Sequence, residues 1–422
     1  MRGTCPAISP DEGGGEEISA SESRTHSARP LSSVAYRPPS SLYLHIPFCL
    51  AKCSYCDFAS YVLPESWHTP YIAALESEVC DVGAGWQRPT LKTLYIGGGT
   101  PTVLSSAQLR SLIAASGRAF LLAPDAEITV EANPGTVTDA SLEGLRQAGA
   151  NRLSLGVQSF QPPHLQLLGR IHTAAQARGA VALARAVGFA NLNLDLIYGL
   201  PGQTLDQWQA DLHEALALAP EHLSLYALTI EEDTPLAARI TCGETPTPDA
   251  DLAAEMYEIA QSVLADAGYV HYEISNWARS RAGDGDYRCR HNLTYWHNEP
   301  YAGCGVAAHS WLLGRRRANV RGLQEYIQRL RQGQDPVAEE EAIGSDLERA
   351  ESMILGLRLL EGVPRAGFQD RYGLDPVALY APVLAETEAL GLLEVTDTHI
   401  RLSPRGLLLG NQVFWRFLPA SP

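Results

Sequence analysis

The segment SLYLHIPFCLAKCSYCDF, residues 41–58, carries the most informative pattern in this chain. It opens with a short apolar run, 41–46, of the length and composition of a buried strand. Cys49, Cys53 and Cys56 follow at once in a C-x3-C-x2-C spacing. Three cysteines in one loop at the end of a strand indicate a metal or iron–sulfur site.

After this segment, strand-like and helical patterns alternate. Apolar runs typical of strands recur at 91–96, 127–132, 152–157, 191–198 and 222–228. Helical spacing separates them at 71–79, 109–120, 140–149, 177–188 and 205–218, and a sixth helix is expected over about 249–267. Three helices begin with capping boxes, at Ser105/Gln108, Thr173/Gln176 and Thr204/Gln207. This alternation predicts an α/β fold with a parallel sheet, and six units suit a partial (β/α)6 barrel better than a closed eight-fold one.

The flanking segments differ in composition. Residues 1–38 are rich in Gly, Ser, Glu and Pro, and we expect a disordered extension there, before a barrel over 39–270. Residues 271–422 are expected to form a C-terminal extension, irregular to about 320, with a helix near 346–360. A further helix then leads into two short strands near 392–403, as in a small winged-helix-like module. We interpret this module as a packing lid rather than a DNA reader, because the chain is acidic.

Composition limits the classes of protein. The chain has 422 residues, 45% of them hydrophobic, and a net charge of −16, which argues against nucleic acid as a major partner. No long apolar run suits a membrane span or a signal peptide, so we expect a soluble, cytoplasmic protein. Eight cysteines are too few for a disulfide framework, and closely spaced cysteines are more often metal ligands or redox groups.

The three neighbouring cysteines have three explanations. Three thiolates can hold a four-iron cluster and leave one iron open to a further ligand. A zinc site would need a fourth ligand, for which His45 and Asp57 are weak candidates. Chance clustering of core cysteines is disfavoured, because the other five cysteines are scattered along the chain. We interpret the group as ligands of a [4Fe–4S] cluster.

Polar residues stand at the ends of successive predicted strands, where barrel enzymes place their sites. The turn GGGTP, 97–101, follows one strand, and Glu131, Gln158, Asp195 and Tyr226 stand near the ends of four others. The repetition predicts a single pocket in which these groups converge on a ligand. Arg170 either supplies a cation to a carboxylate of that ligand or is a solvated residue at a helix start.

With the aromatic Tyr55 before the third cysteine, the spacing resembles the radical S-adenosylmethionine (SAM) superfamily, in which SAM binds the open iron and is cleaved to a radical. From Tyr43 to about residue 230, LYLHIPF, YIGGGTPT, VEANP, RLSLGVQSF, LGRIH and NLDLIYGLPGQT resemble the oxygen-independent coproporphyrinogen oxidase family. The resemblance implies a set of contacts to SAM, namely Tyr43, Tyr55, Gly98, Gly99, Thr100, Glu131, Gln158, Arg170 and Asp195.

Two features favour the HemW-type haem chaperone branch of this family. Phe58 stands where the dehydrogenase branch has a further cysteine. HNLTYW, 291–296, matches the haem-binding motif HNxxYW of the chaperones, with His291, Asn292, Tyr295 and Trp296. Imidazole is a usual ligand of haem iron, and aromatic rings pack on porphyrins. The same stretch could instead be a buried polar–aromatic brace, and the spacing does not decide between His291, His297 and His309 as iron ligand.

The resemblance implies a chaperone that binds a [4Fe–4S] cluster and SAM, takes up haem and transfers it to recipient haemoproteins, membrane-bound respiratory enzymes among them. No catalytic residue is assigned, and whether the chain is an enzyme stays open. The alternative is an oxygen-independent coproporphyrinogen III dehydrogenase, a radical SAM oxidative decarboxylase. A homodimer and peripheral association with a membrane are further expectations, whereas a nucleic-acid partner is not expected.

Overall fold

The computed structural model describes residues 32–281 and 285–419. Most of the expected disordered extension, residues 1–31, lies outside these ranges. Its last part was wrongly predicted, because Ser33–Tyr36 form a 3-10 helix and Ala35 is buried with Trp311 and Ile343. An apolar contact that distant segments provide leaves no periodic signal in the local sequence.

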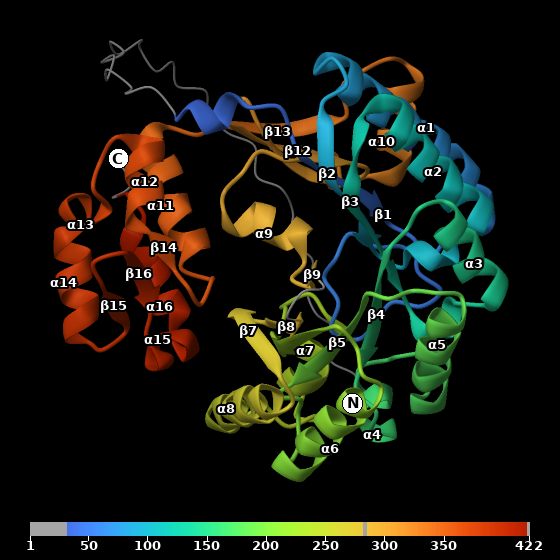
Figure 1. The fold of residues 1–422 in the computed structure, drawn as a ribbon. Coiled ribbons are helices and arrows are strands. Elements are labelled where there is room, and N and C mark those ends of the chain that lie inside the picture. Colours follow the sequence, from blue (N-terminus) through green and yellow to red (C-terminus); the bar gives the residue numbers. More distant parts are fainter. Residues whose placement is uncertain (1–31, 282–284, 420–422) are drawn as a thin grey trace, which may run out of the picture.

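The six predicted strands lie side by side and in parallel at the centre of a ten-stranded sheet (Figure 1). They are β1 (Ser41–Ile46), β2 (Thr90–Gly98), β3 (Leu121–Ala132), β4 (Arg152–Gln158), β5 (Leu192–Tyr198) and β6 (His222–Ala227). The six strands follow one another in chain order, further strands extend the sheet at both ends, and the sheet does not close on itself. The predicted partial barrel is therefore confirmed.

Helices connect these strands. They are α1 (His68–Gly85), α2 (Ser106–Ala119), α3 (Asp139–Gln147), α4 (Pro162–Leu167), α5 (Ala174–Ala186), α6 (Leu205–Ala217), α7 (Pro235–Thr241) and α8 (Ala250–Asp266). The three predicted capping boxes are all present, and a fourth, Thr138 with Ser141, caps α3. Each box satisfies backbone N–H groups that the first turn of a helix leaves without partners.

The strands alternate between an apolar and a polar face, and this alternation creates the site. Leu153 and Leu155 of β4 belong to the main apolar core, whereas Arg152, Ser154 and Gly156 line the interior pocket. Successive side chains of a strand point to opposite faces, so each parallel strand contributes polar groups to the same space. In a fully packed barrel, apolar side chains would fill that space.

The stretch 271–320, expected to be irregular, instead adds strands to the sheet. β7 (Tyr269–Glu273), β8 (Asn276–Arg281) and β9 (Gly285–Asp286) extend it beyond β6, with antiparallel pairing. β10 (Ala302–Cys304) pairs in parallel with β1 at the other end. The short helix α9 (Arg290–Trp296) lies between the barrel and the C-terminal module (Figure 1).

The remaining elements form a second sheet and a C-terminal module. β11 (His309–Leu312), β12 (Arg315–Asn319) and β13 (Val337–Ala342) form an antiparallel sheet, with α10 (Leu323–Arg331) in the same part of the chain. The C-terminal module has its own apolar core and contains α11 (Ser345–Gly356), β14 (Val363–Pro364), α12 (Arg365–Tyr372), α13 (Pro376–Leu379), α14 (Ala381–Ala389), β15 (Leu393–Val395), β16 (His399–Leu402), α15 (Pro404–Leu408) and α16 (Gly410–Phe414). The predicted helix and strand pair of this module are confirmed. Among the described residues, no helix has the length and apolar character needed to span a bilayer.

Candidate functional site

The three cysteines line the mouth of a cavity of about 450 Å³ inside the barrel. Cys49, Cys53 and Cys56 are free thiols and half-buried. Nη1 of Arg170 lies 3.3 Å from Sγ of Cys53, and Oγ1 of Thr100 lies 3.7 Å from Sγ of Cys49. Donors of this kind stabilise thiolates, because hydrogen bonds and positive charge favour the anionic form.

The glycine turn after β2 holds the cysteine loop close to the sheet. A Cβ at Gly99 would lie 2.8 Å from the carbonyl oxygen of Phe48 and 3.0 Å from Sγ of Cys49. Gly98 has φ +112°, a conformation that side chains with a Cβ rarely adopt. These two positions therefore need glycine for close approach and for backbone conformation.

Two half-buried carboxylates, Glu131 and Asp195, line the cavity. Oε2 of Glu131 accepts the Gly98 amide at 3.0 Å, and Oε1 accepts the Tyr95 hydroxyl at 2.6 Å. Burial raises the pKa of Glu131 to about 7, and it also raises the pKa of Asp195. The negative charge of Asp195 further raises the pKa of Glu131. This pair suits a ligand that carries positive charge, such as a sulfonium.

Gln158 and Arg170 are built into the same wall. Gln158 has φ +68°, which is uncommon for a residue with a Cβ, and its Oε1 is buried without a hydrogen-bond partner. Nη2 of Arg170 donates to the Gly156 carbonyl at 2.6 Å, which fixes the guanidinium beside Cys53. Strained backbone and an unsatisfied polar atom are both typical of binding sites. The placement of Arg170 supports its role in the pocket over that of a solvated helix-start residue.

Most of the residues expected to contact SAM line this one cavity, along with Tyr226 and with Asn292 of the HNxxYW motif. They are Tyr55, Gly98, Gly99, Thr100, Glu131, Gln158, Arg170 and Asp195. Tyr43 does not line it. Its hydroxyl lies 3.0 Å from Nδ1 of His45, and its ring packs beside Tyr95 and His291.

Two groups in the barrel interior were missed from the sequence. Arg152 lines the cavity floor and is only 2% exposed, and its charge lowers the pKa values of Glu131 and Asp195. Tyr95 holds Glu131. Both are the first residues of segments quoted above, YIGGGTPT and RLSLGVQSF, but they were given no role there. Both also lie on the polar face of a strand, so the period-two alternation could have indicated them.

His291 lies inside the molecule and not on an exposed face. It is 1% exposed, with Nδ1 2.7 Å from Oγ1 of Thr93 and Nε2 2.8 Å from the Tyr295 hydroxyl. Its ring stacks on Tyr95 at a centroid distance of 5.0 Å. Burial and the charge of Arg152 lower the pKa of His291 to about 3, so the imidazole is neutral. The neutral form is the one that can bind a metal.

The other motif residues and histidines lie further out. The guanidinium of Arg358 stacks over the ring of Trp296 at 4.4 Å, and the indole N–H is buried without a hydrogen-bond partner. His297, at the end of α9, and His309, on β11, are exposed. The motif therefore does brace the barrel against the extension, and one of its members, Asn292, also reaches the cavity.

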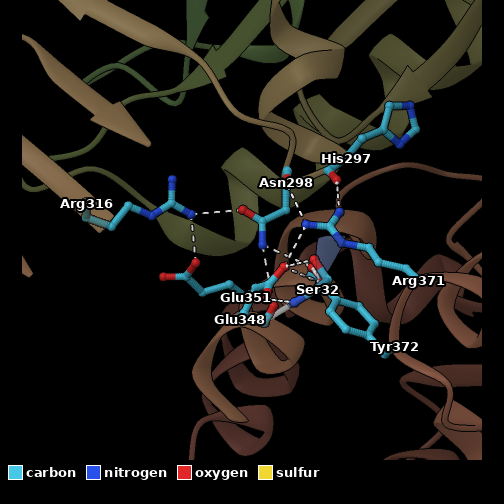
Figure 2. A network of polar contacts seen from close by, with 9 residues as sticks. Ser32, His297, Asn298, Arg316, Glu348, Glu351, Arg371 and Tyr372 are labelled. Atoms are coloured by element: carbon cyan, nitrogen blue, oxygen red, sulfur yellow. Dashed lines mark hydrogen bonds and ion pairs between the residues drawn. The ribbon is translucent and has the colours of Figure 1, made fainter. Parts of the chain in front are cut away.

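A polar network holds the C-terminal end of α9 to the C-terminal module (Figure 2). Arg371 donates to the carbonyl oxygens of His297 and Asn298 and forms an ion pair with Glu348 at 3.1 Å. Glu348 is fully buried and also accepts hydrogen bonds from the backbone and side chain of Ser32. Asn298, Arg316 and Glu351 extend the network, while the imidazole of His297 points away from it (Figure 2).

The donor set at the cavity mouth fits an iron–sulfur cluster better than a zinc ion. A zinc ion needs about four ligands at 2.0–2.3 Å from one point. Within residues 32–281 and 285–419, no three His, Cys, Asp or Glu side chains gather around such a point. His45 is turned to the Ala59 carbonyl at 2.8 Å, and Asp57 is exposed. In a cluster, by contrast, each thiolate binds a different iron.

Comparisons with known proteins agree with this geometry. Residues 43–215 match the family described as the radical SAM superfamily, and residues 348–409 match the HemN C-terminal domain. The chain is 38% identical to the haem chaperone HemW of Bacillus subtilis, over 90% of this chain and 99% of that protein. It is also 38% identical to HemW of Escherichia coli, over 90% of this chain and 98% of that protein.

A solved structure supports the same grouping. The coproporphyrinogen III oxidase HemN of Escherichia coli, a radical SAM enzyme, superimposes with a TM-score of 0.78, 26% identity and 91% coverage of both chains. Similarity to the HemW proteins spans almost their whole length and includes both the cysteine loop and the C-terminal module. The chain belongs to the HemW haem chaperone family of radical SAM proteins.

Proposed function

We propose that this protein is a haem chaperone that binds a [4Fe–4S] cluster and SAM, takes up haem and transfers it to recipient haemoproteins. One observation carries the proposal: the cysteine loop, the two carboxylates and Asn292 of the HNxxYW motif line one continuous cavity. The names of the relatives, which describe haem chaperones, point in the same direction.

In this proposal Cys49, Cys53 and Cys56 hold the cluster, and the polar strand ends hold SAM. Glu131 and Asp195 attract its positive charge, and the glycine turn lets the backbone approach it closely. Arg170, beside Cys53, is placed to receive a carboxylate. A bound cluster would supply the electron that can cleave the SAM sulfonium. The protein groups orient SAM and keep it dry.

Haem binding would use the neutral imidazole of His291. Thr93 contacts Nδ1, and Nε2 faces only the Tyr295 hydroxyl among its hydrogen-bond partners. When Nδ1 donates its proton to the Thr93 hydroxyl, Nε2 carries the lone pair that can bind a metal. Iron would then take the place of the Tyr295 hydroxyl. Because His291 is 1% exposed, α9 must move for haem to reach it.

The second candidate is oxidative decarboxylation of coproporphyrinogen III, favoured by the superposition on HemN. One residue argues against it. Phe58 stands at the position where the dehydrogenase branch has a further cysteine, and its side chain lines the cavity and is 63% exposed. For the chaperone, the recipients we propose are haemoproteins, including membrane-bound respiratory enzymes. We propose that the chaperone is cytoplasmic, that it associates peripherally with the membrane, and that it delivers haem as a homodimer.

Haem titration of the anaerobically reconstituted protein tests the two candidates together. We expect stable haem binding, transfer of haem to an apo-haemoprotein, and no protoporphyrinogen when SAM, a reductant and coproporphyrinogen III are supplied. Substrate-dependent formation of protoporphyrinogen with weak haem binding would overturn the proposal in favour of the decarboxylase.

Variants then identify the iron ligand. Loss of a residue that only supports a metal ligand weakens binding about 10–100-fold. His291→Ala should weaken haem binding by more than this and leave the cluster intact. His297→Ala and His309→Ala, which alter exposed histidines, are the matched controls. Equal haem affinity in His291→Ala and the parent protein would exclude His291 as a required ligand.

A further inference from the structure

One side chain touches both halves of the proposed site. The hydroxyl of Tyr95 donates to Oε1 of Glu131 at 2.6 Å. The ring of the same residue stacks on the imidazole of His291, with 5.0 Å between centroids and 28° between planes. Tyr95 thus orients Glu131, the carboxylate proposed to face SAM, on one side and His291, the proposed iron ligand, on the other. A residue in this position can transmit changes between the two groups.

Strand β2 supplies two further supports of these groups, in addition to Tyr95. Gly98 of β2 donates its amide to Oε2 of Glu131, so two donors from one strand fix both carboxylate oxygens. Thr93 of β2 contacts Nδ1 of His291. The carboxylate and the imidazole are therefore positioned by residues at spacings of two to three along a single strand.

We propose that Tyr95 is a positioning residue that couples the SAM pocket to α9, so that SAM and haem weaken each other's binding. This inference rests on the proposed function. Iron can reach Nε2 of His291 only when the Tyr295 hydroxyl leaves it, and an imidazole that follows the iron moves off the face of Tyr95. Tyr95 then holds Glu131 less firmly, and the pocket binds SAM less tightly.

Linkage gives the reciprocal effect. If haem lowers the affinity for SAM by some factor, SAM lowers the affinity for haem by the same factor. SAM would thus favour release of haem to a recipient without being cleaved. An aromatic pair contributes modestly beyond its buried area, so we expect a factor of about two to ten.

Binding measurements on the reconstituted protein with its cluster test this coupling. The affinity for SAM is measured with and without saturating haem, and the affinity for haem with and without saturating SAM. For each ligand, we expect the ratio of its affinity without the other ligand to its affinity with it to be about two to ten, and the two ratios to agree. If both ligands bind and both ratios are one, the coupling is refuted. If haem does not bind at all, the proposed function fails instead.

Tyr95→Phe separates the role of the hydroxyl from that of the ring. It keeps the ring on His291 and removes the hydrogen bond to Glu131, so SAM affinity should fall about tenfold or more. The ratio of SAM affinities without and with haem should approach one. Tyr257→Phe is the matched control, since it removes a buried hydroxyl that bonds to the Ile274 carbonyl, outside the cavity. An unchanged ratio in Tyr95→Phe would refute the role of Tyr95.

A second variant guards against misfolding of the first. Thr93→Val has nearly the same shape and removes the contact to Nδ1 of His291. It removes the one hydrogen bond from β2 to the imidazole and leaves the stacking on Tyr95, so a shift in haem affinity with unchanged SAM affinity in the absence of haem is expected. Unchanged haem affinity would contradict the claim that β2 holds His291 in place.

Discussion

Removing Arg371 should destabilise the protein far more than removing an exposed arginine. The guanidinium bonds two carbonyl oxygens at the end of α9 and pairs with Glu348, whose side chain is 0% exposed while that of Arg371 is 13% exposed. In Arg371→Ala, Glu348 keeps Ser32 and Tyr372 as donors but loses its opposite charge. Breaking one partner of a buried pair costs about 3–5 kcal/mol.

A double-mutant cycle isolates the pair. Glu348→Gln removes the buried charge, so Arg371→Ala should cost less in that background, by about 0.5–3 kcal/mol. The assay is urea unfolding followed by tryptophan fluorescence. Trp311 is a local reporter, because its ring lies 4.9 Å from Arg316 and 5.8 Å from Arg371.

The matched control is Arg317→Ala, on strand β12. Arg317 pairs with Glu340 at 2.6 Å at the surface, with side chains 38% and 30% exposed, so its loss should destabilise the protein far less than the loss of Arg371. Strict additivity of the two changes in the Arg371–Glu348 cycle, or a cost for Arg371→Ala no larger than that of the control, would refute the interpretation of this network as a buried charge pair.

Three further predictions concern the cluster and two buried carboxylates. Cys53→Ala should abolish the visible absorbance of the reconstituted cluster, while Cys80→Ala, at an exposed cysteine of α1, should retain it; colour in Cys53→Ala would contradict the ligand assignment. SAM binding, measured by titration, should strengthen as pH rises through about 7, where Glu131 loses its proton, and Glu131→Gln should remove that dependence. Burial raises the pKa of Glu78 from 4.5 to about 7, so between these two pH values the folded state binds more protons than the unfolded state. The free energy of unfolding should therefore fall by about 3 kcal/mol as pH rises from 4.5 to about 7. Glu78→Gln should flatten this part of the pH profile of unfolding, and an identical profile would show that Glu78 is not responsible.

The barrel could be predicted because its signals are local. Each parallel strand is a short apolar run, and each capping box is complete within four residues, as at Thr204 and Gln207. The pocket could be predicted because the ends of parallel strands meet at one edge, which brings Glu131, Gln158 and Asp195 together.

What the sequence did not reveal depends on contacts between distant segments. β10 contains only Ala302, Gly303 and Cys304, and it becomes a strand because it pairs with β1, more than 250 residues earlier. The orientation of α9 is a similar case. The motif HNxxYW indicates aromatic and polar contacts, but only the tertiary packing turns His291 inward to Thr93 and leaves His297 exposed.

The structure of α9 is set by its neighbours and not by its own sequence. At seven residues, it is shorter than isolated helices that are stable in water. Glu127 accepts the backbone N–H groups of Arg290 and His291 at its start, β2 holds its inner face, and Arg371 holds its last carbonyl groups. Most of these contacts are hydrogen bonds, which can be exchanged for others, and the stacking of His291 on Tyr95 adds an aromatic contact. A change in any of them therefore changes the helix that carries the motif, which is the property that the proposed binding and release of haem by this helix would require.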